Sequence, residues 1–149
     1  MKAHIGVDTD SGLVHSVVGT AANVNDVTQA GALVHGEETD VFADAGYQGV
    51  AKREETQGIE ATWNVAMRPG KRKTLDKSTP MGEIMDKLKQ TKARIREKVE
   101  HPFRVSKQQF GYAKVRYRGL AKNTARLTML FALSNLWMVR KRLLNMERG

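Results

Sequence analysis

The sequence predicts an α/β fold, and three observations lead to this prediction. Segments typical of strands and helices alternate over residues 1–70, in the order strand, strand, helix, strand, helix, strand. Strand signals become rare from Gly82 onward, where long helical patterns begin. A hydrophobic content of 40% in 149 residues suffices for the core of one domain. We expect a single domain, with a sheet-forming part at 1–70, a basic loop at 71–81 and a helical part at 82–149.

The first two strands are expected to form a β-hairpin. Residues 3–8 and 13–20 are rich in β-prone side chains, and the segment DTDSG joins them with turn residues. Asn25 or Asp26 can then cap a helix that runs to Val34 or His35 and ends at Gly36. A short apolar strand at 40–44 follows, and it stops at a glycine-rich loop.

The rest of the sheet-forming part contains a charged helix and a further strand. The segment VAKREETQG favours a helix that ends at Gly58. The segment EATWNVAMRPGKRK begins as a strand, which Pro69 and Gly70 close. The basic connector that follows has no hydrophobic periodicity and is expected to be a loop.

Two long helices are predicted in the helical part. Apolar residues at 84, 85, 88, 95 and 99 form a helical stripe. Pro102 is expected to kink or interrupt this helix, because proline removes a hydrogen-bond donor and clashes with the preceding turn. The segment KNTARLTMLFALSNLWMVRKRLL is apolar almost all round in its middle, so we expect a buried helix that packs on the sheet.

Charge and composition restrict the class of partner. The formal net charge of +9 favours a polyanion, and nucleic acid is the commonest large one. The absence of cysteine excludes disulfides and thiolate metal sites. No signal-peptide pattern is visible, and the longest apolar stretch, residues 127–139, is too short to span a bilayer. We expect a cytoplasmic protein without a membrane partner.

Two carboxylates stand out against the basic background. Glu100 lies in REKVEHPFRVSK, where helical spacing puts Arg96, Glu100 and Lys107 on one face. Asp44 ends the predicted strand at 40–44, and the carboxyl ends of strands line the usual ligand crevice of open α/β sheets. Each acid also has an ordinary structural role available, an ion pair between Arg96 and Glu100 and a helix cap at Asp44. The functional interpretation is a magnesium site beside phosphate-binding cations.

Longer motifs run through nearly the whole chain: KAHIGVDTDSGLVHSVVGTAANVNDVTQA, VFADAGYQG, VAMRPGKRK, VEHPFRVSKQQFGY and KVRYRGLAKNTARL. Together they resemble the carboxy-terminal part of bacterial insertion-sequence transposases of the DDE type. The second catalytic Asp of that family lies in a motif like ADAGY, which matches Asp44. Its catalytic Glu lies in a signature of Tyr, two residues, Arg, three residues, Glu, six residues, Lys. Arg96, Glu100 and Lys107 match this signature in spacing and type, whereas Ala93 stands at the Tyr position.

The resemblance implies an RNase H-like fold, Mg²⁺ or Mn²⁺ as cofactor, and strand cleavage and transfer at the ends of an insertion sequence in DNA. Asp44 and Glu100 would be the catalytic metal ligands, and Arg96 and Lys107 would bind DNA phosphates. A bacterial cytoplasmic protein that joins the nucleoid when bound to DNA is implied as well. Two basic runs fit contact with the DNA backbone, although each also has an ordinary interpretation as a solvated face, and Tyr112 and Tyr117 would stack on bases. The runs are Arg68, Lys71, Arg72 and Lys73 in the first, and residues 114–122 in the second.

The resemblance further implies a third catalytic carboxylate, an Asp on a strand that precedes the hairpin. We therefore expect a fragment that lacks this first strand, is inactive alone, and pairs with another copy or with the missing amino-terminal part. Asp8 and Asp10 are the remaining candidates for the first acid, but their position favours turn formation. Two other functions stay open: a non-catalytic basic DNA-binding protein, and an RNA-binding domain inferred from charge alone.

Overall fold

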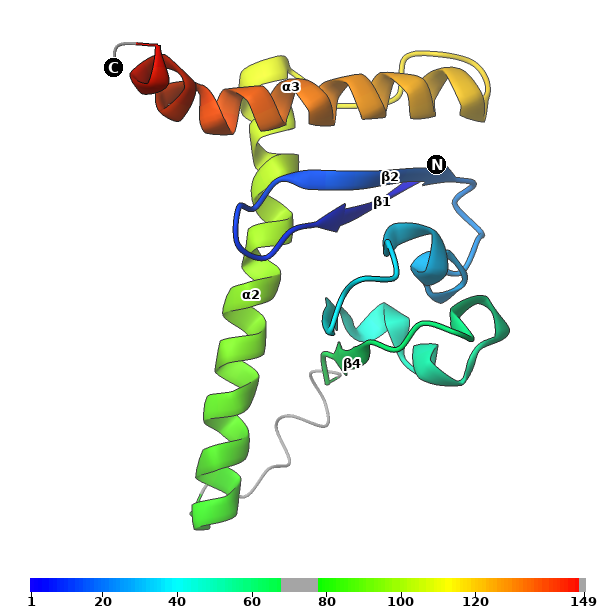
Figure 1. Cartoon of the computed structure of the whole chain (residues 1–149). Helices are drawn as coiled ribbons and strands as arrows, with labels where there is room; N and C mark the ends of the chain where they lie inside the picture. The colour runs from blue at the N-terminus through cyan, green and yellow to red at the C-terminus, as the bar shows by residue number, and fades with distance from the viewer. Residues whose placement is uncertain (68–77, 148–149) are drawn as a thin grey trace. The chain divides into compact units, whose positions relative to one another are not determined.

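The structure is a computed structural model that describes residues 1–67 and 78–147, and it divides into two compact units. Unit 1 comprises Met1–Val24 and Lys98–Gly149, and unit 2 comprises Asn25–Glu97. The elements in Figure 1 are β1 (Lys2–Val7), β2 (Val14–Thr20), η1 (Asp26–Leu33), β3 (Asp40–Ala43), η2 (Ala45–Tyr47), η3 (Val50–Lys52), η4 (Glu54–Thr56), β4 (Thr62–Val65), α2 (Pro80–Phe110) and α3 (Leu120–Met146). The predicted loop at 71–81 lies mostly outside the described residues.

The strands form two separate pairs. β1 and β2 are the predicted hairpin, antiparallel from Lys2 opposite Thr20 to Val7 opposite Val14. β3 and β4 are parallel. The mixed α/β content is therefore confirmed, but the expectation of one sheet is wrong for the described residues. The hairpin packs on one hydrophobic cluster in unit 1, and β4 packs on another in unit 2.

The core of unit 1 joins the hairpin to α3. Val14, Leu127 and Phe131 are buried together, and the ring of Phe131 meets that of Phe103 edge-on, with centroids 5.1 Å apart. Polar contacts fix the register of this packing. The Asn135 amide accepts a hydrogen bond from the main-chain N–H of Val14 at 2.9 Å and donates one to its carbonyl at 2.8 Å. β2 is thus attached to α3 by both apolar burial and directed hydrogen bonds.

Helix α3 is buried on one face only, which corrects the prediction of a buried helix. Its buried residues are Asn123, Leu127, Leu130, Phe131 and Ser134. The other face exposes large apolar side chains, among them Met129, Leu136, Leu143 and Leu144. The local sequence is apolar all round, but a two-stranded hairpin covers only one side of a helix.

Helix α2 continues through Pro102, so the expected interruption does not occur. The proline ring is one of the most completely buried side chains, and Val105 and Ser106 are buried beside it in the sequence. The hydroxyl groups of Ser106 and Ser134 are hydrogen-bonded at 2.9 Å, which joins α2 to α3. Tertiary burial of this segment offsets the loss of one main-chain hydrogen bond.

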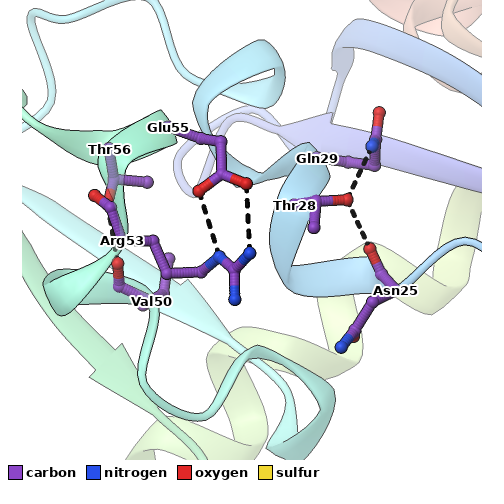
Figure 2. Close-up of polar contacts among 7 residues, drawn as sticks. All are labelled: Asn25, Thr28, Gln29, Val50, Arg53, Glu55 and Thr56. Carbon is purple, nitrogen blue, oxygen red and sulfur yellow. Dashed lines mark hydrogen bonds and ion pairs between the residues drawn. The ribbon is translucent and has the colours of Figure 1, made fainter.

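Unit 2 contains 3₁₀ helices at the two positions where helices were predicted. The predicted helix after Asn25 forms as the eight-residue η1, with the main-chain N–H of Thr28 donating to the Asn25 carbonyl three residues back. Figure 2 shows that the Thr28 hydroxyl donates to the same carbonyl, at 2.7 Å. η1 ends at Leu33, close to the predicted boundary.

The predicted charged helix at 50–58 is replaced by the separate turns η3 and η4. Arg53, which stands between them, has an extended backbone, with φ −93° and ψ 149°. The Thr56 hydroxyl donates to the carbonyls of Val50 and Arg53, and the Arg53 guanidinium contacts the Glu55 carboxylate (Figure 2). These local side-chain bonds compete with helical ones and favour turns.

Candidate active site

Asp44 follows β3 directly and is the N-cap of η2. Its Oδ1 accepts a hydrogen bond from the main-chain N–H of Gly46 at 2.7 Å. The side chain is exposed, at the carboxyl end of a strand as the sequence predicted. The capping role is therefore present, and it engages one carboxylate oxygen.

A second carboxylate, from Asp26, lies beside Asp44. A Cβ atom added at Gly46 would stand 3.0 Å from Oδ1 of Asp44 and 3.3 Å from Oδ2 of Asp26. The charges of both acids also affect Tyr47. Burial raises the pKa of its hydroxyl to about 12, and the negative charges of Asp44 and Asp26 add to the shift. The sequence indicated only a capping role for Asp26. No local pattern links it to an acid eighteen residues later, because the contact is tertiary.

Glu100, Arg96 and Lys107 all lie on α2, with the spacing that returns to one helix face. Glu100 and Lys107 are exposed, and Arg96 is half-buried. Within the described part of the chain no ion pair joins Arg96 to Glu100. The carboxylate of Glu100 is thus not held by the arginine four residues before it. Asp44 belongs to unit 2 and Glu100 to unit 1, and their proximity stays a prediction.

Asp8 is engaged in the hairpin turn, as its position predicted. Its Oδ1 accepts hydrogen bonds from the hydroxyl and the main-chain N–H of Ser11, each at 2.6 Å. The hydroxyl bond, followed by the main-chain bond, holds the pKa of Asp8 below its ordinary value. These bonds favour the turn-forming role of Asp8 over a role as the first catalytic acid.

A basic loop between α2 and α3 is held in place by two side chains of α3. The buried Asn123 donates to the carbonyls of Tyr117 at 2.6 Å and Gly119 at 2.8 Å, and accepts from the Tyr117 N–H at 3.2 Å. The Arg126 guanidinium lies 5.6 Å from the ring centroid of Tyr112 and 5.8 Å from that of Tyr117. No local sequence pattern predicts these contacts. These contacts fix the position of Tyr117. Its neighbours in the sequence, Arg116 and Arg118, are exposed.

The formal charge is divided unequally between the units. Unit 1 has 13 Lys and Arg against 4 Asp and Glu, and unit 2 has 12 of each kind. The whole net charge of +9 therefore belongs to unit 1. The remaining basic candidates, Arg68, Lys71, Arg72 and Lys73, lie outside the described residues.

Comparison with protein-family models gives a match to the transposase DDE domain over residues 1–136. The matched range includes Asp44 and Glu100 and covers most of the chain. The chain belongs to the transposase DDE domain family. This membership suggests DNA transposition as the activity and DNA as the partner. No solved structure matches the chain.

Transposase DDE domains generally use divalent metal ions, and the chemistry around Gly46 fits such an ion. Within residues 1–67 and 78–147 no group of three or more His, Asp or Glu side chains is placed to hold a metal. Mg²⁺, however, keeps several waters and is often held by one or two carboxylates together with substrate phosphates. Oδ1 of Asp44 and Oδ2 of Asp26, both hard oxygen donors, lie within 3.3 Å of the Cβ position that Gly46 leaves unfilled.

Among the described residues of this transposase domain, no helix is both long enough and apolar enough to cross a bilayer.

Proposed function

We propose that this domain acts in metal-dependent strand cleavage and transfer at insertion-sequence ends, through an RNase H-like arrangement of Asp44 and Glu100. The observation that carries the proposal is the family match across residues 1–136, which spans both acids and the strand that Asp44 follows. Exposure of both carboxylates supports it, because a DNA phosphate must reach the site from solvent.

The residues have distinct proposed roles. Asp44 and Glu100 would hold Mg²⁺ or Mn²⁺, which supplies charge stabilisation at a phosphate and lowers the pKa of a bound water or hydroxyl. Arg96 and Lys107 would position the DNA backbone, since their spacing places them beside Glu100 on α2. These two acids are fewer than a two-metal site needs, so we expect little cleavage from this chain by itself.

Crosslinking can test the proximity of the two acids, because the chain contains no cysteine. We expect the Asp44→Cys/Glu100→Cys double variant to be joined by a short thiol-specific crosslinker. The matched control is Asp44→Cys/Glu97→Cys, since Glu97 points to a different side of α2. Equal or lower yield for the 44–100 pair than for the 44–97 pair would remove the basis for the shared site.

DNA binding is proposed to follow the charge of unit 1, with the loop at residues 113–119 as one contact. Affinity should fall by orders of magnitude as salt rises, because bound phosphates release counterions. The variant Arg116→Ala/Arg118→Ala should reduce the slope of log affinity against log salt by about 2. Lys52→Ala, in the neutral unit 2, should leave the slope unchanged. Affinity that is insensitive to salt, or equal slopes for both variants, would contradict this assignment.

A non-catalytic DNA-binding role is the second candidate, and the charge of unit 1 favours it. A cleavage assay on DNA that carries the element's ends, with Mg²⁺ or Mn²⁺, separates the two. Even weak cleavage that Asp44→Asn and Glu100→Gln both abolish supports the enzyme. Salt-dependent binding that neither variant nor added metal changes, without any cleavage, supports the binding protein.

A further inference from the structure

The starting observation is the position of Gly46 between two acids from different elements. Asp26 begins η1, and Asp44 caps η2. The Cβ position of Gly46 is within 3.3 Å of an oxygen of each. The two oxygens are therefore at most 6.3 Å apart, on the same side of Gly46.

A divalent cation beside two neighbouring carboxylates favours the charged form of both. Hard divalent cations bind oxygens at about 2.0–2.6 Å, so two oxygens on one ion lie within about 5 Å of each other. At the upper bound of 6.3 Å the two oxygens would have to approach each other by about 1.3 Å to share one ion. Oδ1 of Asp44 accepts a hydrogen bond from the main-chain N–H of Gly46, and Oδ2 is the oxygen proposed to bind the ion. Half-burial of Asp26 and exposure of Asp44 leave the site accessible to water and phosphate.

We propose that Asp26 is a metal ligand, the companion carboxylate of Asp44, and that Gly46 is required because a side chain would fill the space between them. The proposal rests on the proposed function, since it adds a ligand to the metal site assigned to Asp44. It predicts that the ion is held mainly within unit 2, where positive and negative residues balance.

The competing explanation is structural. Asp26 is the acidic residue in the first turn of η1, where a negative charge stabilises the helix start. That role would affect thermal stability but not metal affinity. Asparagine caps a helix start about as well as aspartate, so Asp44→Asn removes the charge and keeps the cap of η2, whereas Asp26→Asn removes the charge of the residue that follows the N-cap Asn25.

The test is a Mn²⁺ titration of the full chain, with free Mn²⁺ followed by its paramagnetic resonance signal. Asp26→Asn and Asp44→Asn should each raise the dissociation constant at least about tenfold, as is usual when a metal site loses a supporting group. The control is Asp40→Asn. Asp40 is an exposed acid of β3 that accepts a hydrogen bond from the Asn64 amide, and the amide oxygen of asparagine can still accept this bond. It should bind Mn²⁺ like the unmodified chain.

Gly46→Ala supplies a variant without any change in charge. Its methyl group would press on both carboxylates and should weaken Mn²⁺ binding several-fold. Thermal unfolding without metal shows that each variant is folded. Unchanged affinity in Asp26→Asn, with affinity lost in Asp44→Asn, would overturn the role of Asp26 alone. Unchanged affinity in Asp44→Asn, or no Mn²⁺ binding by the unmodified chain, would overturn the proposed metal site as well.

Discussion

Replacing Leu127 with alanine tests how α3 packs in unit 1. Leu127 is 2% exposed and lies in one cluster with Val14 and Phe131. Leu→Ala changes in protein cores cost about 2–5 kcal/mol, and the cost is larger where neighbours cannot relax into the cavity. Here the neighbours are constrained by the edge-on ring contact of Phe131 and by the two hydrogen bonds of Asn135. We expect a loss of about 3–5 kcal/mol, a large share of the stability of a typical domain.

Leu136→Ala is the matched control on the same helix. Leu136 is 57% exposed, so the same chemical change should alter the free energy of unfolding by about 0.5 kcal/mol or less. Both variants change helix propensity equally, and the difference between them isolates burial. The assay is urea unfolding followed by Trp137 fluorescence in a Trp63→Phe background, so that the signal comes from α3 alone. Equal losses in the two variants, or a larger loss at Leu136, would refute the orientation of α3.

Three further predictions concern individual contacts. Asn123→Ala should lower the free energy of unfolding by about 1–3 kcal/mol, because buried loop groups lose their partners; an unchanged melting temperature would contradict it. Gly19→Ala should destabilise the chain, since its Cβ would overlap Thr124 Oγ1, and adding Thr124→Ala should restore part of the lost stability in thermal unfolding. Ser11→Ala should raise the lowered pKa of Asp8 toward its ordinary value, measured by NMR titration. Because the pKa of Asp8 is lowered in the folded chain, the hydrogen bonds of its carboxylate stabilise the fold above about pH 4. This stabilisation is lost as acid protonates Asp8, and it should be smaller in the Ser11→Ala variant.

Local features were predicted well where a few neighbouring residues determine them. The hairpin follows from β-prone runs around a turn sequence, and the Ser11 bonds to Asp8 show why that turn forms. Asp44 was placed correctly at a strand end because an apolar run stops there at small residues. The location of η1 was predicted, whereas its tighter 3₁₀ winding was not.

Features that depend on distant neighbours could not be read from the sequence. The expectation that proline interrupts a helix rests on local geometry, and the interruption does not occur at Pro102, which is buried. The exposed face of α3 depends on how much of the helix the hairpin covers, which no helical periodicity encodes. Likewise, the contact between Asp26 and Asp44 became visible only through the space around Gly46.

The division of charge implies that the two proposed activities can be separated by mutation. Affinity for DNA should depend mainly on unit 1, which has the whole net charge of +9, with Arg96 as a proposed contact from unit 2, and should weaken steeply with salt. Affinity for a divalent ion should depend mainly on Asp26 and Asp44 in unit 2, with Glu100 as the proposed ligand from unit 1, because a short-range ligand bond is screened much less than a long-range field. Moderately high salt should therefore release DNA while Mn²⁺ stays bound, and Asp26→Asn should weaken Mn²⁺ binding while leaving the salt slope of DNA binding unchanged. If both affinities instead fell together in every variant, one shared surface would hold metal and DNA, and the assignment of separate roles to the two units would be wrong.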